Sequence, residues 1–217
     1  MIRIGYFFGT FEDWGGASRA LLNFVKSIGK EAITPIVILT KEGKLSAELR
    51  DLGFECAFWP KHELSKNMLS NAYHIVQSAR FLREMAFDIV HLNYGSTEWK
   101  SPIVLAAKWR KIPIVYHYHS EIKAPSRFVR YASAVIVVSD YIKRHAETLG
   151  RPTYTVHNIV DIRRFAAGKD IGDDLGIPPD CVIVSFVGQV KIIKGIKTFL
   201  RAIDRIERPN VRFLIAG

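Results

Sequence analysis

The sequence predicts an α/β protein built on a parallel sheet, and three observations support this fold class. Short apolar runs rich in β-branched and aromatic residues alternate with segments whose apolar residues recur at helical spacing. The first run, Ile2–Phe8, is apolar almost throughout, which is typical of a strand buried on both faces of a parallel sheet. The order of strand, glycine-bearing loop and helix then starts again at Cys181, so we expect one full domain and part of a second.

Each predicted strand is an apolar run bounded by glycine, proline or polar residues. The strands are Ile2–Phe8, Ile33–Leu39, Phe54–Trp59, Asp88–Leu92, Ile112–His119, Ala134–Val138, Thr153–Val156, Cys181–Val187 and Val211–Ala216. Apolar residues three and four apart predict the helices Ala17–Ile28, Leu45–Leu52, Ala72–Met85, Glu98–Arg110, Phe128–Ala132, Asp140–Leu149 and Gly195–Ile206. Ser139 is a natural N-cap, Gly29 and Gly150 are placed to end helices, and the polar-rich stretch 61–71 is predicted as a loop.

The mixed, charged segment 158–179 is the best candidate for a linker because it holds three glycines and two prolines. We therefore expect an N-terminal domain over residues 1–165, a linker over 166–180 and the start of a second domain over 181–217. The second unit contains only two predicted strands and one helix, which would leave apolar faces without partners. We expect the chain to be a truncated protein.

The net charge of +10 indicates a basic surface, and most of the excess lies between residues 100 and 151, where ten basic residues face three acidic ones. Solvated helix faces and a surface that leans on anionic lipid both fit this excess, whereas no nucleic-acid-binding motif is present. With no secretion signal, no run of about 20 apolar residues and no C-x-x-C spacing for Cys56 and Cys181, we expect a cytoplasmic protein with reduced thiols.

The loop after the first strand lies where ligands bind in open α/β sheets, beyond the carboxyl ends of the strands. Gly15 and Gly16 would let the backbone approach a ligand, and the N–H groups of the following helix attract oxyanions. A tight turn without a ligand explains the pair equally well. The G-x-G-x-x-G fingerprint is absent, so NAD is not favoured.

Histidines gather at the end of the fifth strand, where His117 and His119 should point to one face of the sheet. Three roles compete for them. His91, His117 and His119 could hold a metal ion, although only Glu121 is at hand to complete such a site. The imidazoles could instead bond to the neighbouring backbone, or His119 could contact a ligand at the sheet edge.

Lys191 and Lys194 flank the loop after the strand Cys181–Val187, next to the predicted helix start at Gly195. A diphosphate would fit there, because lysine charge and helix N–H groups together neutralise a phosphate leaving group. Two solvated loop lysines are the simpler alternative.

Seven segments, taken in order, give the chain a recognisable pattern. They are GGASRALLNFVKSI at 15–28, DIVHLNYG at 88–95, PIVYHYHSE at 113–121, SAVIVVSDYIKRHA at 133–146, VHNIVDIRRF at 156–165, VSFVGQVKIIKGIKTFLRAI at 184–203 and VRFLIAG at 211–217. In this order they resemble the retaining GT-B glycosyltransferases of family GT4. The resemblance implies two Rossmann-like domains, with the N-terminal domain on the acceptor side and the start of a nucleotide-sugar-binding domain after the linker.

The resemblance also implies a reaction and a set of site residues. A sugar would pass from a nucleotide-sugar to an acceptor (a glycan, a lipid-linked molecule or a small molecule) with retained configuration and without a cofactor or a required metal. His119 would be the catalytic histidine near the sugar, and the donor and its phosphates would be bound by Gly15, Gly16, Gln189 and Lys194. Gln189 stands where the family commonly has arginine.

The same resemblance leads us to expect that the fragment is inactive alone, because the family's paired-glutamate motif would follow Gly217. Asn158 and Asp161 match the family's N-G-V-D linker motif, with Ile159 in place of its glycine. A peripheral enzyme at the inner face of the membrane, with no nucleic-acid partner, is the reading that we favour. Two alternatives remain: a GT-B nucleotide-sugar epimerase, and a non-catalytic basic module that docks on a membrane or on a partner.

Overall fold

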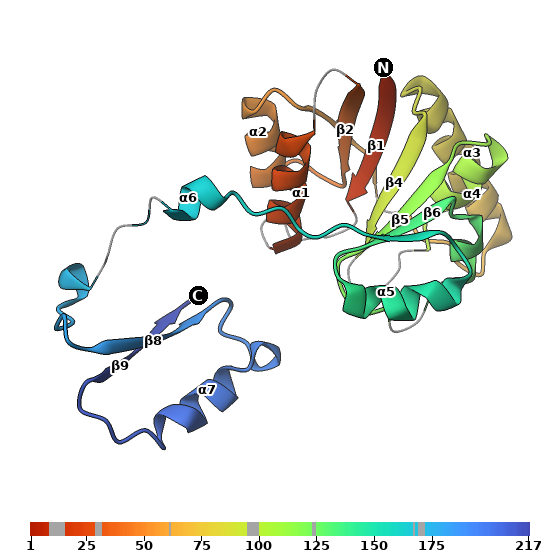
Figure 1. Cartoon of the computed structure of the whole chain (residues 1–217). Helices are drawn as coiled ribbons and strands as arrows, with labels where there is room; N and C mark the ends of the chain where they lie inside the picture. Colours follow the sequence, from red (N-terminus) through yellow and green to blue (C-terminus); the bar gives the residue numbers. More distant parts are fainter. Residues whose placement is uncertain are drawn as a thin grey trace. The chain divides into compact units, whose positions relative to one another are not determined.

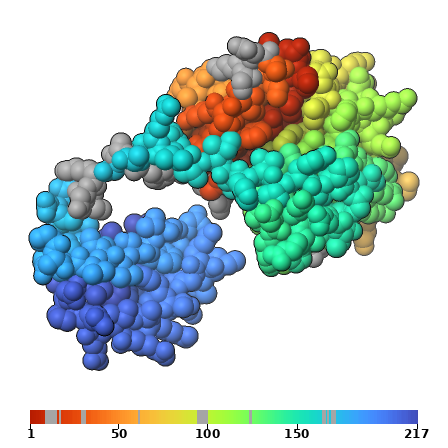
Figure 2. Space-filling model, in the orientation of Figure 1, coloured from red at the N-terminus to blue at the C-terminus, as the bar shows by residue number. Residues whose placement is uncertain are grey.

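The computed structural model describes residues 1–8, 16–28, 32–60, 62–94, 100–122, 125–166, 168 and 172–217. These residues form two compact units, Met1–Asp161 and Ile162–Gly217, and each unit is described by itself below. In the first unit, segments distant in sequence pack into one body, as the neighbouring red, orange and green atoms of the space-filling view show (Figure 2). The predicted boundaries at residues 165 and 181 stay a prediction.

A parallel sheet forms the centre of the first unit (Figure 1). Its strand order within the described residues is β3-β2-β1-β4-β5-β6-β7. The strands are β1 (Ile2–Phe8), β2 (Ile33–Leu39), β3 (Glu55–Phe58), β4 (Ile89–Tyr94), β5 (Ile114–Tyr118), β6 (Ala134–Val137) and β7 (Thr153–Thr155). The order reverses between β1 and β4, and such a switch point is where open α/β sheets bind ligands.

Helices follow the strands in the order that the sequence predicts. They are α1 (Gly16–Ser27), α2 (Lys44–Asp51), α3 (Met68–Glu84), α4 (Pro102–Trp109), α5 (Asp140–Ala146) and the 3-10 helices η1 (Arg127–Tyr131) and η2 (Glu147–Leu149). The predicted N-cap Ser139 is confirmed, since its hydroxyl accepts a hydrogen bond from the N–H of Ile142. Gly150 ends this segment in the left-handed region at φ 64°. The predicted stop at Gly29 and the loop residue Lys61 lie outside the described residues.

Two predicted helix starts were wrong, and capping side chains explain both. Helix α3 begins at Met68 inside the predicted loop, because the Asn67 side chain accepts a hydrogen bond from the N–H of Ser70 at 3.1 Å. Helix α4 begins at Pro102 because the Ser101 hydroxyl caps it, and proline suits the first helical position.

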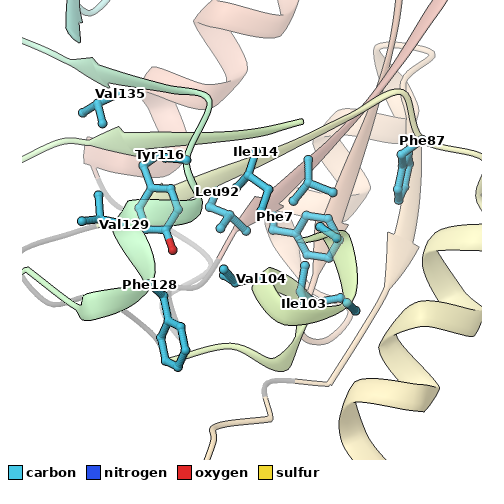
Figure 3. Close-up of a cluster of buried hydrophobic side chains, with 14 of the residues drawn as sticks. Phe7, Phe87, Leu92, Ile103, Val104, Ile114, Tyr116, Phe128, Val129 and Val135 are labelled. Carbon is cyan, nitrogen blue, oxygen red and sulfur yellow. The ribbon is translucent and has the colours of Figure 1, made fainter. Parts of the chain in front are cut away.

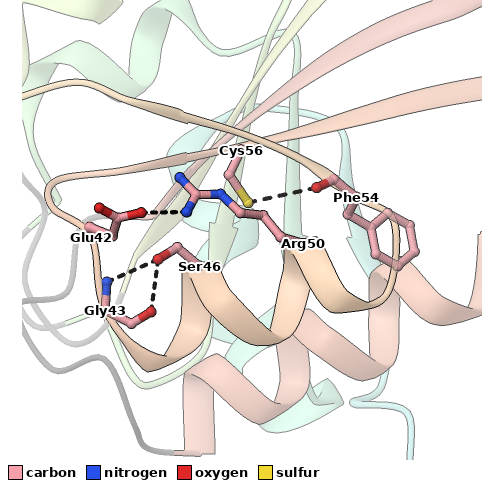
Figure 4. Close-up of polar contacts among 6 residues, drawn as sticks. All are labelled: Glu42, Gly43, Ser46, Arg50, Phe54 and Cys56. Atoms are coloured by element: carbon pink, nitrogen blue, oxygen red, sulfur yellow. Dashed lines mark hydrogen bonds and ion pairs between the residues drawn. The ribbon is translucent and has the colours of Figure 1, made fainter.

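A close network of polar contacts holds the start of α2 (Figure 4). The Ser46 hydroxyl accepts from the Gly43 N–H at 2.9 Å and donates to the Gly43 carbonyl at 2.8 Å. The Arg50 guanidinium pairs with Glu42, and the Cys56 thiol lies 4.0 Å from the carbonyl of Phe54. Both cysteines carry free thiols, and burial raises the pKa of the Cys56 thiol.

Two hydrophobic clusters cover the two faces of the sheet. The larger one joins β1, β2, β4, β5 and β6 to α3, α4, η1 and α5, with Phe7, Leu92 and Tyr116 at its centre (Figure 3). The smaller one packs α1 and α2 on the other face of β1 and β2, with Tyr6 and Leu22 inside it. Among the described residues, the helices of the smaller cluster thus cover the second face at β1 and β2, and β1 is the neighbour of β4, which carries His91.

Gly5 of β1 leaves room for a core ring. A Cβ at this position would meet the Phe87 ring at 2.9–3.0 Å, and the Phe87 side chain is buried. We expect Gly5→Ala to lower the free energy of unfolding by about 1–3 kcal/mol through overpacking, measured by urea denaturation. Because Phe87→Leu shortens the opposing side chain, the double variant should be more stable than the sum of the two single changes predicts.

Gly16 provides the control for this prediction, because a Cβ there has no neighbour within 4 Å in the part of the chain that the structure describes, and Gly16→Ala should not destabilise the chain. Additive effects of Gly5→Ala and Phe87→Leu would show that the ring does not limit this position.

The second unit holds β8 (Val182–Val187), β9 (Val211–Ala216) and α7 (Ile196–Ile203), with β8 and β9 parallel. The segment predicted as a linker contains the short helix α6 (Ile162–Ala166) and the 3-10 helix η3 (Asp173–Leu175). Phe199 of α7 packs against Phe186 and Phe213 of the two strands, with ring centroids 5.6 Å and 6.2 Å apart. The predicted restart of the strand, loop and helix order is confirmed.

Candidate functional site

The candidate site lies at the carboxyl ends of β4 and β5. Along β5 the side chains alternate, so Tyr116 and Tyr118 enter the larger core while His117 and its neighbour His119 project from the opposite face. The two imidazoles stack with centroids 4.2 Å apart and an interplanar angle of 30°. This confirms the prediction that both histidines share one face.

The register of the sheet adds two residues to this stack. Asn93 of β4 stands opposite His117 of β5, and His91 of β4 stands opposite Tyr6 of β1. His91 Nε2 lies 3.2 Å from His117 Nδ1, and the His91 ring packs on Tyr6 with centroids 4.7 Å apart. His119 Nε2 lies 3.3 Å from Asn93 Oδ1. A connected row of three imidazoles and one amide results.

The segment after β7 covers part of this row. A small cavity of about 10 Å³ is lined by His119, Asn93 and His117, by Leu21 and Phe24 of α1, and by residues 156–159. The Asn23 amide donates a 2.8 Å hydrogen bond to the carbonyl of Ile159 and thereby ties this segment to α1. The cavity has room for about one water molecule. A ligand larger than water must therefore displace residues 156–159 or reach His119 from its partly exposed side.

Several polar atoms of this row have unmet hydrogen-bonding capacity. Asn93 Nδ2, His117 Nε2 and His119 Nδ1 are buried and have no hydrogen-bond partner among the described residues. Since Asn93 Oδ1 accepts from His119 Nε2, the neutral imidazole presents Nδ1 as an acceptor, while the amide presents N–H donors. A hydroxyl group can donate to the first and accept from the second, so the pair suits a hydroxyl-rich ligand.

Burial keeps these imidazoles uncharged. Desolvation lowers the pKa of His91 from 6.5 to about 3, and it also lowers the pKa of His117 and of His119. Like charge on His119 would further disfavour protonation of His91 and His117. Near pH 7 the three rings therefore act as neutral hydrogen-bonding groups.

The metal alternative gains no support from this geometry. Among the described residues, no group of three or more His, Cys, Asp or Glu side chains has an arrangement that could hold a metal ion. The ring nitrogen of His91 that faces His117 is already engaged with that imidazole.

The predicted phosphate-binding residues are placed as follows. Gly15 lies outside the described residues, and Gly16 is the exposed first residue of α1. Gln189 and Lys194 both belong to the loop between β8 and α7 in the second unit, where Lys194 ends the 3-10 helix η4 (Ile192–Lys194). Gly195 turns the chain at φ 86°, and α7 starts at Ile196 with its N–H groups at this loop.

Two residues of the site escaped the sequence analysis. Asn93 lies two residues after His91 on β4, so strand alternation places both side chains on the same face. This pattern could have identified Asn93 from the sequence. The contact of Asn23 with Ile159 joins residues 136 positions apart and has no local signal. Asn158, which the sequence analysis matched to the linker motif, lines the cavity beside His119.

The parallel sheet of the first unit, with the helices that pack on it, has the α/β architecture of the GT-B fold type, as predicted. Residues 14–164 match the sequence profile of glycosyltransferase family 4. This match covers more than half of the chain, and the chain belongs to that family. None of the curated proteins compared with the chain matches it.

Solved structures agree with this fold. A glycosyltransferase from Rickettsia africae superposes with a TM-score of 0.75 at 18% identity, over 100% of this chain and 60% of that one. HepE from Anabaena, in complex with UDP and glucose, gives 0.73 at 16% identity, over 99% and 60%. A UDP-GlcNAc 2-epimerase from Neisseria meningitidis, bound to UDP-GlcNAc, gives 0.61 at 15%, over 99% and 65%. The chain thus spans about three fifths of the length of these proteins.

Proposed function

We propose that the chain is part of an enzyme that transfers a sugar from a nucleotide-sugar to an acceptor with retention of configuration and without a required metal. The observation that carries this proposal is the Asn93–His119 pair, whose unmet hydrogen-bonding atoms suit sugar hydroxyls in a chain of glycosyltransferase family 4. UDP and glucose in the complex of HepE support a nucleotide-sugar as the donor.

In this proposal, different protein groups bind the sugar and the diphosphate of the donor. His119 Nδ1 accepts from a sugar hydroxyl, and the Asn93 amide donates to the same or to the adjacent hydroxyl. Lys194 and the N–H groups of α7 neutralise the diphosphate as its bond to carbon breaks, and Gln189 donates a neutral hydrogen bond. The Gly15-Gly16 loop approaches the donor through its backbone.

Lys194 gives a direct test of donor binding. We expect Lys194→Ala to weaken UDP binding about tenfold, because a charge-assisted hydrogen bond to phosphate is lost. Isothermal titration of the purified protein with UDP measures this effect. Arg201→Ala is the control, since Arg201 carries the same charge in the last turn of α7. Equal UDP affinity of Lys194→Ala and the wild type would remove Lys194 from the site.

An epimerase is the second candidate, because the fold is shared with a UDP-GlcNAc 2-epimerase. The family match favours transfer. An epimerase consumes its nucleotide-sugar without an acceptor, whereas a transferase needs one, so the acceptor dependence of turnover separates the two. The inactivity of this chain alone and its cytoplasmic location stay predictions.

A further inference from the structure

Helix α3 exposes a stripe of large apolar side chains that ends in two arginines. Leu69 and Tyr73 are 84% and 61% exposed, Val76 follows on the same face, and Arg80 and Arg83 continue it at the helical spacing of three and four residues. Polar residues normally occupy such a face, so an apolar stripe over the first half of the helix indicates a contact with another surface.

Helix α4 adds a tryptophan to this stripe. The helix is buried through most of its length, but Trp109 in its last turn is 65% exposed between Lys108 and Arg110. Helices α3 and α4 lie side by side on one face of the sheet (Figure 1). A surface cavity of about 440 Å³ joins them, lined by Val76, Ala79, Arg80, Arg83, Trp109 and Arg110. We call Leu69, Tyr73, Val76, Trp109 and these three arginines the α3–α4 surface.

The charge on the α3–α4 surface is of one sign. No acidic side chain is among the described residues that line the cavity. Within the described part of the chain, none of the three guanidinium groups forms an ion pair. Three like charges around one cavity repel one another, and bound anions relieve this repulsion. Guanidinium groups bind phosphate oxygens through paired hydrogen bonds.

A second basic groove lies at the N-terminal end of α3. It measures about 1020 Å³, and its lining combines the apolar residues Ile75, Leu105 and Phe128 with the basic residues Lys66, Lys100, Arg127 and Arg130. The described residues that line it again include no acidic side chain. Apolar and basic groups are thus combined along the whole length of α3.

We propose that the α3–α4 surface docks this protein on a bilayer that contains anionic phospholipids. Leu69, Tyr73 and Trp109 enter the interface, where aromatic side chains keep an apolar body in the lipid and a polar edge in water. Arg80, Arg83 and Arg110 bind the phosphate groups. A second copy of the chain is a poor partner, because two identical basic surfaces repel each other.

This docking is peripheral and independent of the proposed sugar transfer. Among the described residues, no helix combines the length and the apolar character that crossing a bilayer requires. Most of the net positive charge in the sequence lies between residues 100 and 151, whereas the α3–α4 surface also includes residues between 69 and 83 of α3.

The test is co-sedimentation of the protein with phosphatidylcholine vesicles that contain or lack about one quarter phosphatidylglycerol, at about 0.05 M and about 0.5 M NaCl. We expect binding to the anionic vesicles at low salt and at least tenfold weaker binding at high salt or without the anionic lipid. Arg80→Glu/Arg83→Glu and Leu69→Ser/Trp109→Ser should each lower the partition coefficient at least tenfold.

Matched controls lie elsewhere on the same unit. Lys26→Glu/Lys44→Glu reverses two exposed charges on α1 and α2, which pack on the opposite face of the sheet. Tyr154→Ser removes an aromatic side chain of β7 whose exposed fraction is close to that of Trp109, which the apolar surface variant changes. The controls should bind within about twofold of the wild type, with circular dichroism confirming that all variants are folded. Equal binding to both kinds of vesicle, or unchanged binding of both surface variants, would overturn the proposal.

Discussion

Replacing His119 by alanine should lower kcat/KM for sugar transfer by about 10²–10³-fold. The imidazole is held in place by its stacking on His117 and its hydrogen bond to Asn93, so its Nδ1 is oriented before a ligand arrives. Contacts that are fixed in advance contribute most in the transition state, because no reorganisation is needed when charge develops on the sugar. Initial rates over a range of donor concentrations measure the effect.

Asn93 allows a stricter version of this test. Because Asn93 orients His119 and shares the ligand with it, Asn93→Ala in the His119→Ala background should cause much less additional loss than Asn93→Ala in the wild type. His145→Ala, a change of an exposed histidine on α5, is the control and should retain full activity. If His119→Ala had the same kcat/KM as the wild type, His119 would have no role in the reaction.

Acid should destabilise this protein strongly, and the buried histidines are the reason. Their pKa values in the folded chain lie below the ordinary value of 6.5, so the unfolded state binds protons that the folded state excludes. Their contribution to stability is complete above pH 6.5 and is lost progressively below it. At about pH 4.5, His91 alone should lower the free energy of unfolding by roughly 2–3 kcal/mol relative to its value above pH 6.5. His91 and His117 together should lower it by about twice as much. This loss is a large part of the free energy of unfolding of a typical domain, which is about 5–15 kcal/mol.

The measurement is the free energy of unfolding by urea as a function of pH. His91→Gln keeps a hydrogen-bonding group next to His117, but the glutamine side chain does not titrate. The slope of the free energy of unfolding against pH, between about pH 4.5 and about pH 5.5, should therefore fall by about 1.4 kcal/mol per pH unit, which corresponds to about one proton. An equal slope in His91→Gln and the wild type would mean that His91 already binds its proton in the folded state.

Much of the fold follows from local patterns in the sequence. The strands Ile2–Phe8, Ile33–Leu39 and Val211–Ala216 begin and end where the apolar runs predict. The first two are buried over most of their length, and a strand buried in a parallel sheet tolerates few polar residues. The starts of α3 and α4 were missed, because a single capping side chain, Asn67 or Ser101, decides where each helix begins.

The candidate site was only partly predictable. Strand alternation places His117 and His119 on one face, and the structure confirms it. The pairing of Asn93 with His119 and of His91 with His117 depends on the register between β4 and β5, which no local pattern specifies. Gly15 lies outside the described residues, and a common role for His119 and Lys194 stays a prediction because the two units are described separately.

The most direct test of the central proposal is the acceptor dependence of nucleotide-sugar turnover by the gene product. We predict that release of the nucleoside diphosphate requires an acceptor, that mass spectrometry finds the acceptor heavier by one sugar residue, and that NMR shows the anomeric configuration of the donor retained in the product. Turnover at the same rate without any acceptor, with an epimerised sugar as the product, would contradict the proposal.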